Sequence, residues 1–364
     1  MASTPRILII SSLIDPHADA VRWALGRQGI ATDLWDLGAF PASSEMGLVM
    51  HEGSFGVQTR QGKSSADGPY DVVWMRRKEA CKARPDTHRD DVRIVERESE
   101  CFMANALDWL GHDKTLWVNH PHHEWRANLK AHQLLVAQKA GFKVPPTYMG
   151  NSPEAVRRLY AEQGEAIVYK PFRSGGWVND NQTNTVLRTA RLNASHLAND
   201  YAIAACPGIY QALVEKAFEV RATVFGGQIH SVKIDSQRNG ATIDWRYDFR
   251  PGQEPIEAFD LPDEVGRCCL AVCEAFSLAF ATFDLIVDKA GDYVFLEINP
   301  AGQFLFAEHH VPDVRLLDGF SRFLAGVSGW EGSSSSAALL GDYFGSPSYD
   351  ALLVLQKAQL GSDT

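Results

Sequence analysis

Apolar runs and stretches with helical spacing alternate from the start of the chain. An apolar run at 6–12 is followed by helical spacing over 15–28, which stops at Gly29, and then by a second apolar run at 31–35. This order predicts a strand, a helix and a strand. The next predicted elements are a helix at 90–110 and strands at 57–60, 71–75 and 116–119. Residues 1–120 are therefore expected to form a small open α/β domain.

Shorter helices and further strands are expected after residue 120. A helix is predicted over 124–140 with Gly141 ending it, and another over 153–163 with Ser152 as its N-cap. The Ser-, Gly- and Asn-rich stretch 173–184 predicts a loop. The remaining predicted elements are strands at 166–170, 185–188, 209–214, 220–225 and 228–235 and helices at 262–278 and 312–325.

The same pattern suggests how the second part of the chain is divided. A central unit is expected at 121–210 and a C-terminal unit at 211–326. Glycines and a run of serines predict a flexible linker at 327–346, and residues 349–359 predict a short terminal helix. The segment 327–364 is therefore expected to be linker and tail.

A β-hairpin in the C-terminal unit is the most informative feature of the sequence. Two apolar runs, Phe283–Val287 and Tyr293–Ile298, flank a polar turn at Lys289–Asp292. A loop of two or of four residues at this turn gives the same register. In that register Asp284 lies directly opposite Glu297.

Three oxygen-bearing side chains then share one face of the hairpin. Side chains alternate across a strand, so Glu297 and Asn299 are expected on the same face as Asp284. Buried carboxylates are costly unless they are paired or bound to a cation. An all-oxygen set of this kind suits Mg²⁺. The alternative is a solvated hairpin whose acidic side chains face water.

These residues also carry a family resemblance. Asp284, followed by Glu297-Ile298-Asn299-Pro300, resembles the metal-binding end of the ATP-grasp fold. The continuation Ala301-Gly302-Gln303-Phe304 is similar to the ATP-grasp ligases that close ester or amide rings in ribosomally made peptides, the microviridin-type or graspetide macrocyclases. The tripeptide Asp244-Trp245-Arg246 and the pair Arg76-Arg77 resemble the same branch. The resemblance covers about residues 1–326. It implies an α/β pre-ATP-grasp domain followed by two α+β subdomains that hold ATP between them.

Two lysines are candidate phosphate ligands. Lys170 ends an apolar predicted strand, so it needs an anionic partner or must reach solvent. In the family that the chain resembles, lysines at the positions of Lys130 and Lys170 contact the α- and β-phosphates of ATP. Ser174, Gly175 and Gly176 follow Lys170 closely, and they match the family's flexible phosphate loop.

The resemblance also assigns residues to the rest of the nucleotide. Backbone groups at Leu213 and Val214 match the positions that hold adenine, and Gln211 opens this segment where many relatives carry a glutamate. Glu219 matches the acid that takes the ribose hydroxyls. Arg221 matches an arginine that can neutralise an acyl phosphate and the transferring γ-phosphate, and together with Lys170 it is expected to be catalytic. The alternative for Glu219 and Arg221 is an ion pair on an exposed sheet surface.

Charge and composition narrow the class of partner. The formal net charge is −10, which argues against nucleic acid as the main partner. Six cysteines occur without a C-x-x-C pair, and neither a signal peptide nor an apolar stretch long enough for a bilayer is recognised, so a cytoplasmic protein is expected. Histidines at 120, 122, 123, 309 and 310 match no common zinc spacing. Arginines cluster at Arg76-Arg77 and at Arg238–Arg250, which favours an acidic substrate.

The expected activity follows from the resemblance. It implies an ATP- and Mg²⁺-dependent ligase that activates a carboxylate as an acyl phosphate and then forms side-chain esters or amides in a precursor peptide with an acidic core. Arg76, Arg77, Arg238 and Arg246 are expected to bind this peptide. The alternative is a ligase that joins an amino acid to a peptide or to another amino acid. Relatives often form dimers, so a homodimer is also an expectation.

Overall fold

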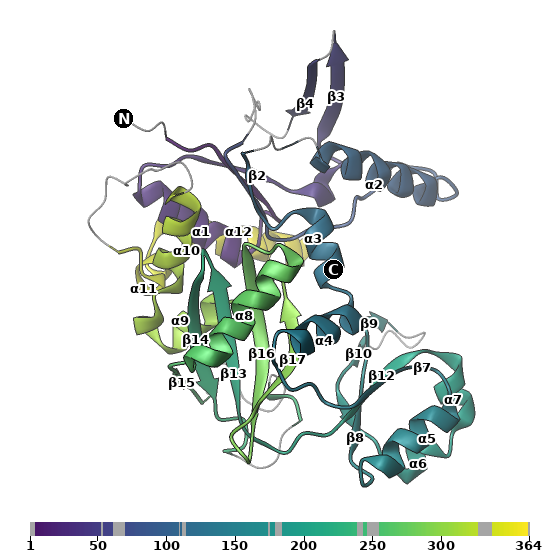
Figure 1. Ribbon diagram of the computed structural model, residues 1–364. Helices are drawn as coiled ribbons and strands as arrows, with labels where there is room; N and C mark the ends of the chain where they lie inside the picture. The colour runs from purple at the N-terminus through teal and green to yellow at the C-terminus, as the bar shows by residue number, and fades with distance from the viewer. Residues whose placement is uncertain are drawn as a thin grey trace.

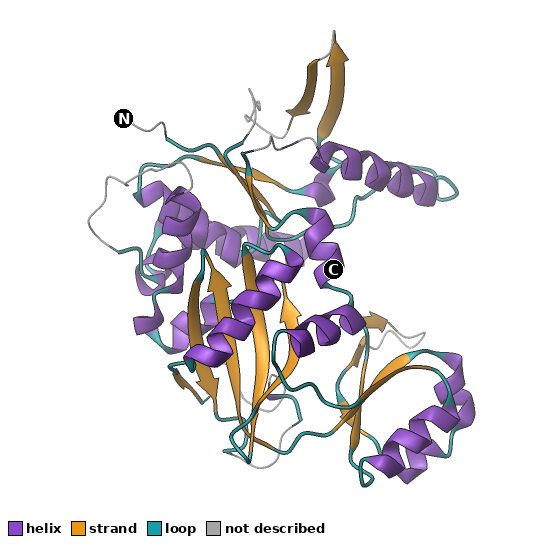
Figure 2. Cartoon of the chain, viewed as in Figure 1, coloured by secondary structure: helices purple, strands orange, loops and turns teal. Residues whose placement is uncertain are grey.

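The computed structural model describes residues 4–51, 54–60, 70–108, 110, 114–173, 175–178, 184–238, 243–245, 255–326 and 337–362. Three sheet-based units follow one another along the chain (Figure 1). Helices lie against each unit's main sheet, while a separate two-stranded hairpin projects from the N-terminal unit (Figure 2). None of the helices in the described part combines the length and apolar character that crossing a membrane requires.

The N-terminal unit is the predicted open α/β domain. Its parallel strands are ordered β2-β1-β5-β6, and β1 and β5 are buried along their whole length. The prediction missed most of the projecting hairpin, of which only 57–60 was expected. The elements of this unit are β1 (Ile7–Ile10), α1 (Pro16–Arg27), β2 (Thr32–Trp35), η1 (Leu37–Ala39), β3 (Glu45–His51), β4 (Ser54–Arg60), β5 (Val72–Met75), α2 (Val92–Asp108) and β6 (Leu116–Val118).

The helix predicted over 124–140 is two helices. α3 (Pro121–Ala127) begins where the His120 side chain accepts a hydrogen bond from the His122 amide. α4 (Lys130–Lys139) begins after Leu129, whose backbone is extended. The prediction was wrong here because Leu129 fits the apolar spacing of a helix although its backbone interrupts one. The interruption makes Lys130 the first residue of α4.

The central unit is a four-stranded antiparallel sheet ordered β11-β8-β12-β7. A short hairpin, β9 and β10, follows β8 and occupies part of the stretch predicted as a loop, while Ser174 and residues 179–183 lie outside the described residues. The elements are β7 (Thr147–Gly150), α5 (Pro153–Glu162), β8 (Ile167–Lys170), β9 (Gly175–Val178), β10 (Asn184–Leu187), β11 (Ala190–Arg191), α6 (Ala194–Leu197), α7 (Asp200–Ala205) and β12 (Gly208–Ala212).

The C-terminal unit is a five-stranded sheet ordered β15-β14-β13-β16-β17. Val220, Ala222 and Val224 point to one face and join a core with Cys269 and Val272 of α8. The alternate residues of β13 point to the opposite face. The elements are β13 (Lys216–Phe225), β14 (Gln228–Ile234), β15 (Ile256–Ala258), α8 (Asp263–Phe276), β16 (Phe280–Asp288), β17 (Tyr293–Asn299), α9 (Leu305–His310), η3 (Pro312–Val314) and α10 (Leu316–Gly326).

The β16–β17 hairpin has the predicted pairing of Asp284 with Glu297, although its turn differs. Asp288 pairs with Asp292 around a three-residue loop, and Gly291 adopts a φ of +89° there. This loop alone would shift the register by one residue. A bulge opposite Asp284–Leu285, where Leu296 is the extra residue, restores it.

The segment expected to be linker and tail is folded where the structure describes it. α11 (Leu340–Phe344) and α12 (Pro347–Ser362) pack beside α1, and Tyr343 donates a hydrogen bond from its hydroxyl to Asp19 at 2.8 Å. The linker prediction was wrong for residues 337–346 because Leu340 and Tyr343 are core residues. Residues 327–336 lie outside the described part.

Candidate active site

Two carboxylates and an amide lie side by side on the open face of the C-terminal sheet. Asp284 on β16 pairs with Glu297 on β17, and Asn299 lies two residues further along β17. The side chains of Asp284 and Glu297 are 28% and 36% exposed, so a ligand can reach both. The Asn299 side-chain oxygen accepts a hydrogen bond from the Ala301 amide at 3.0 Å, which fixes its direction. The structure therefore brings the predicted oxygen set together.

Each carboxylate has a basic partner. Arg221 lies opposite Asp284 on β13, and its Nη1 is 2.5 Å from Asp284 Oδ1. Lys130 Nζ is 2.7 Å from Glu297 Oε2. Arg221 Nε is buried and, among the described residues, has no hydrogen-bond partner. Such an orphaned donor beside a carboxylate marks a place where an anionic ligand would be stabilised.

Lys170 is the second lysine that the structure places here. Its Nζ donates to Gln211 Oε1 at 2.7 Å, and the buried Gln211 amide donates in turn to Thr147 Oγ1. Burial lowers the pKa of Lys170 and the charge of Lys130 adds to the effect, while Glu297 opposes it. A half-buried ammonium close to a second lysine gains from an anion such as a phosphate. The family resemblance assigned Gln211 to the nucleotide, whereas here its side chain hydrogen-bonds to Lys170 and orients it.

Glu219 is buried on the same face of β13 as Arg221. Its Oε1 is 2.6 Å from Lys216 Nζ, and Ser236 also hydrogen-bonds to it. Burial raises the pKa of Glu219, and these two partners oppose that rise. In the described residues Glu219 pairs with Lys216 and Arg221 pairs with Asp284, so the alternative of an ion pair between Glu219 and Arg221 is not the arrangement found. Lys216 was not predicted, although its position three residues before Glu219 could have suggested it.

The connection between β12 and β13 carries the predicted adenine positions. The Leu213 amide already donates to the Ala166 carbonyl at 2.8 Å, so its N–H is used within the protein. Val214 is half-buried in the same connection. Gly175 and Gly176 open β9, five and six residues after Lys170, the last residue of β8. The assignment of these backbone groups to a nucleotide stays a prediction.

The N-terminal domain holds the loop that follows β17. We call residues 300–305 the anchor loop. The buried Asn119 side chain donates to the Pro300 carbonyl at 2.8 Å, and Arg76 Nη1 donates to the Ala301 carbonyl at 2.6 Å. Neither contact was predicted. Asn119 lies just after β6, at the carboxyl edge of a parallel sheet where functional side chains often gather, which is the signal that could have identified it.

His17 holds the other end of the anchor loop. The Phe304 and Leu305 amides donate to His17 Nε2 at 3.2 and 3.3 Å, so the unprotonated nitrogen faces the loop. Burial lowers the pKa of His17 to about 3, and the neighbouring Arg76 adds to this effect. Asp15 caps α1 and forms an ion pair with Arg76 at 3.1 Å. The start of α1 and the end of β5 therefore position the anchor loop together.

The state of His17 gives a testable pH dependence. His17 is neutral in the folded chain down to a pKa of about 3, whereas an unfolded histidine takes up a proton near 6.5. Stability is therefore lost as the pH falls through this window, because the unfolded chain binds the extra proton. His17→Gln keeps an acceptor for the loop amides without titrating. We expect the variant to lose less free energy of unfolding than the parent between pH 7 and pH 5, by on the order of 1–2 kcal/mol.

Urea titrations at the two pH values measure this difference. His310→Gln is a control, because that ring is only partly buried and hydrogen-bonds within α9. An equal loss of stability in the parent and in His17→Gln would contradict the neutral, buried state of His17.

The predicted substrate arginines occupy different environments. Arg76 is 3% exposed and braces the anchor loop, whereas the Arg77 side chain is 46% exposed beside it. Arg238 is exposed after β14, and Arg246 lies outside the described residues. Trp245 packs on Phe306 at a centroid distance of 6.0 Å, and the Arg221 guanidinium is also 6.0 Å from the Phe306 ring. The Asp244–Trp245 segment therefore reaches the site.

The site has the donor chemistry for a hard divalent cation. Asp284, Glu297 and Asn299 offer carboxylate and amide oxygens, which Mg²⁺ prefers. Within the described residues, no three His, Cys, Asp or Glu side chains cluster so as to hold a metal ion by themselves, and the histidines near position 120 form no such group. The two carboxylates are therefore suited to an ion that takes its remaining ligands from phosphate and water.

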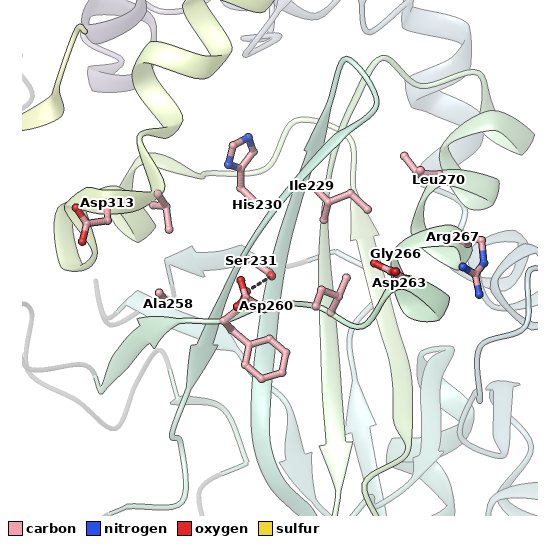
Figure 3. A pocket seen from close by; sticks show the side chains of 13 residues that line it. Ile229, His230, Ser231, Ala258, Asp260, Asp263, Gly266, Arg267, Leu270 and Asp313 are labelled. Carbon is pink, nitrogen blue, oxygen red and sulfur yellow. Dashed lines mark hydrogen bonds between the residues drawn. The ribbon is translucent and has the colours of Figure 1, made fainter.

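A cavity of about 750 Å³ lies elsewhere, between β14, the start of α8 and η3 (Figure 3). Its walls include His230, Phe259, Asp263 and Arg267. None of the predicted site residues lines it. We therefore base the site on the grouped charges of the open sheet face rather than on this cavity.

Solved structures resemble this chain although its sequence matches no protein-family model and no curated protein. A RiPP-associated ATP-grasp ligase from Chryseobacterium gregarium, in complex with ADP and a leader and core peptide, has a TM-score of 0.80 at 23% identity, covering 88% of this chain and 96% of that one. Macrocyclase MdnC from Microcystis aeruginosa, bound with precursor peptide MdnA, has a TM-score of 0.78 at 24% identity, covering 88% and 99%. ATP-grasp ligase PsnB, complexed with a minimal precursor, has a TM-score of 0.72 at 26% identity, covering 89% and 100%.

These similarities confirm the expected fold. The chain has the ATP-grasp fold with an N-terminal α/β domain, and its architecture is that of the RiPP-associated ATP-grasp ligases. The matched structures are covered almost completely, so the likeness extends over all three units and is not limited to one sheet.

Proposed function

We propose that this chain is an ATP- and Mg²⁺-dependent ligase that forms side-chain ester or amide crosslinks in a ribosomally made precursor peptide. The observation that carries the proposal is the register that pairs Asp284 with Glu297 and places Arg221 and Lys130 on them. It is supported by three structural relatives, described as ATP-grasp ligases or as a macrocyclase, which were solved with leader, core or precursor peptides. One of them also carries ADP, and another PsnB complex contains Mg and ADP.

The residues of the site would bind different parts of the Mg²⁺–ATP complex. Asp284, Glu297 and Asn299 would hold Mg²⁺, which when bound neutralises and polarises phosphate oxygens. Lys130 and Lys170 would release Glu297 and Gln211 and contact the phosphates of ATP. Gly175 and Gly176, with Ser174, would approach the phosphates through their backbone. Leu213 and Val214 would contact adenine, and Glu219 would take the ribose hydroxyls.

Two steps follow from this arrangement. A substrate carboxylate attacks the γ-phosphorus of ATP, which breaks the bond to ADP and gives an acyl phosphate. A hydroxyl or amine of the same peptide then attacks the acyl carbon and releases phosphate. Arg221, which lies beside Asp284 on the open face, would offset the charge that develops in both steps. Burial of Lys170 strengthens its interaction with the same charge.

We propose that the precursor peptide has an acidic core. Arg77 is exposed beside the anchor loop and Arg238 is exposed beyond β14, and Arg246 is proposed to join them. Arg76 would support Arg77 from behind, because it is buried against Asp15. In a chain of net charge −10, such a local basic group favours acidic peptide side chains. We also propose that the chain forms a homodimer.

Product mass separates this function from its alternative. We expect incubation with ATP, Mg²⁺ and an acidic peptide encoded beside this gene to give products lighter by one water per bond, with one ADP formed for each. An intermolecular ligase would instead give a heavier product and would require a free amino acid. A heavier product would therefore contradict the cyclisation and support the alternative.

Lys170→Ala tests the nucleotide side of the proposal. Loss of one charge-assisted contact should weaken binding of a non-hydrolysable ATP analogue by about ten- to a hundredfold, equivalent to about 1.5–3 kcal/mol. Isothermal titration calorimetry measures the affinity. Lys289→Ala is the matched control, because Lys289 lies in the hairpin turn and pairs with the exposed Glu215. Equal affinities for the Lys170→Ala variant and the parent would remove Lys170 from the nucleotide site.

A further inference from the structure

An aromatic pair adjoins Arg221 on the open face of the C-terminal sheet. The centre of the Phe306 ring, on α9, is 6.0 Å from the Arg221 guanidinium carbon, and the Trp245 ring lies against Phe306 with the two centroids 6.0 Å apart. Both aromatic residues are half-buried, so each keeps part of its surface accessible. Arg221 is also the partner of Asp284, so the pair stands next to the proposed metal and phosphate site.

Trp245 is placed by a contact two residues before it. Lys216 Nζ donates to the Ile243 carbonyl at 3.1 Å and to Glu219 Oε1 at 2.6 Å. The Lys216 side chain is 8% exposed, so these bonds lie in a low-dielectric environment that strengthens them. Residues 243–245 are therefore fixed to β13 at one end and to α9 through the Trp245 ring at the other.

The same segment lies near the second lysine of the site. Burial lowers the pKa of Lys170, and the charge of Asp244 is one of those that oppose this shift. Asp244 comes directly before Trp245, whose ring packs on the side of Phe306. The segment is therefore close to both basic residues, Lys170 and Arg221, that are proposed to act on the transferring phosphate.

Phe306 is held by its backbone and by its neighbours. Its carbonyl accepts a hydrogen bond from His310 Nδ1 at 2.8 Å, within α9. Arg221 Nη2 donates to the Gln303 carbonyl at 3.0 Å, which ties the guanidinium to the anchor loop just before Phe306. The Phe306 ring also packs against the hydrophobic core that includes Phe304. Phe306 and Arg221 are therefore held in a defined position relative to each other.

This position matters because the proposed intermediate also reacts with water. An acyl phosphate passes its acyl group to a hydroxyl or an amine, whereas water converts it to the free carboxylate and phosphate. One ATP and one water are then consumed, ADP and phosphate are formed, and the peptide is returned unchanged. Asp284 and Glu297 have side chains that are 28% and 36% exposed, so the open face alone does not keep water away. Apolar ring surface beside Arg221 excludes water there and strengthens the interaction of the guanidinium with phosphate.

We propose that Phe306 and Trp245 form a wall that keeps water from the acyl phosphate at Arg221. This role rests on the ligase function proposed above and adds to it the protection of the intermediate. Neither ring gives or takes a proton, so both act by position and by excluding water. If the pair served packing alone, its loss would slow ADP formation and crosslinking to the same extent.

The number of ADP molecules formed per crosslink measures this protection. With ATP, Mg²⁺ and the acidic peptide encoded beside this gene, we expect about one ADP per crosslink from the parent. Phe306→Leu removes the ring but keeps an apolar side chain, and it should raise this ratio at least about threefold. Trp245→Leu should raise the ratio in the same direction without altering α9. Phe306→Tyr retains the ring and should keep the parent ratio.

Hydroxylamine provides a second readout that follows the intermediate itself. It reacts with an acyl phosphate to give a hydroxamate and phosphate, and mass spectrometry detects the hydroxamate on Asp or Glu side chains of the peptide. We expect Phe306→Leu to give at least about three times as much hydroxamate as the parent, because the opened wall admits the small nucleophile. Phe259→Leu is the matched control and should behave like the parent. Phe259 is also half-buried and lies 5.6 Å from Phe218, within the core on the α8 side of the sheet.

The possible failures are distinguishable. The parent ratio in both Phe306→Leu and Trp245→Leu, whatever their rates, would overturn the proposed wall and leave the pair a packing role. Excess ADP that forms equally without peptide would overturn it as well, because that ADP would come from direct hydrolysis of ATP. A parent that forms no ADP, or forms ADP without crosslinks, would contradict the ligase function itself. Thermal unfolding of the same samples shows that the variants compared are folded.

Discussion

Glu297→Gln is expected to reduce ADP formation by at least about a hundredfold while the chain stays folded. The substitution removes one of the two carboxylates that face each other across β16 and β17, and it leaves the shape of the side chain unchanged. It also breaks the pair between Glu297 and Lys130, which is partly exposed and therefore contributes about 0–1 kcal/mol to stability. Coupled-enzyme measurement of ADP and thermal unfolding on the same preparation separate the two effects.

The same sheet provides a closely matched control. Glu257 on β15 pairs with Lys233 on β14 at 2.7 Å, the same distance as the pair of Glu297 with Lys130. Glu257→Gln therefore removes an equivalent ion pair at the far edge of the sheet, and we expect its activity to equal that of the parent. If Glu297→Gln formed ADP at the parent rate in saturating Mg²⁺, the metal assignment would fail.

The hairpin shows how far a local pattern can predict this site. Alternation of apolar residues correctly paired Asp284 with Glu297, although the loop has three residues where two or four were expected. The pairing survived because the bulge at Leu296 compensates for the odd loop length. A bulge in an apolar strand has no distinct composition, so it could not be predicted. The predicted register was therefore correct although the predicted loop length was wrong.

Contacts between domains were beyond the sequence pattern. Asn119 reaches Pro300, and His17 reaches Phe304, across more than 180 and 280 positions of the chain respectively. No periodicity relates residues so far apart. We predicted that Arg76 binds substrate because it is one of two adjacent arginines at the end of a strand. In the structure Arg76 is buried and forms an ion pair with Asp15. Which of two neighbouring charged residues faces solvent depends on tertiary packing.

In the tail, amino-acid composition wrongly predicted an unfolded segment. Glycine and serine between 327 and 346 indicated a linker, yet Ala338, Leu340 and Tyr343 are buried. The buried Glu308 accepts hydrogen bonds from the Leu317 and Leu340 amides, at 2.6 and 2.8 Å, and so holds the starts of α10 and α11. A few apolar residues and one distant carboxylate are enough to order this segment, and they are too sparse for a helical pattern to reveal.

Gly302→Ala is the substitution in the anchor loop from which we expect the largest effect. A Cβ at this position would lie 1.9 Å from Thr282 Oγ1 and 3.0 Å from Arg221 Nη2. The loop must therefore move away from β16, and the hydrogen bond that Arg221 Nη2 donates to the Gln303 carbonyl is lost. Arg221 is then no longer held beside Asp284 on the open face of the sheet. We therefore expect kcat/KM to fall by about 30- to 100-fold. Overpacking of this kind also costs about 1–3 kcal/mol of stability.

Two further variants show whether the loss acts through this contact. Gly341→Ala adds the same methyl group in α11, where nothing lies within 4 Å, and should behave like the parent. Thr282→Ala in the Gly302→Ala background removes the hydroxyl that makes the closest contact and should recover part of kcat/KM, while the Thr282 Cβ contact at 2.9 Å remains. Binding of an ATP analogue should change less than turnover in Gly302→Ala, because Lys130 and Lys170 belong to α4 and β8 rather than to the loop. If affinity fell as far as kcat/KM, the loop would support the nucleotide site as a whole, and the specific link between Gly302 and Arg221 would be wrong.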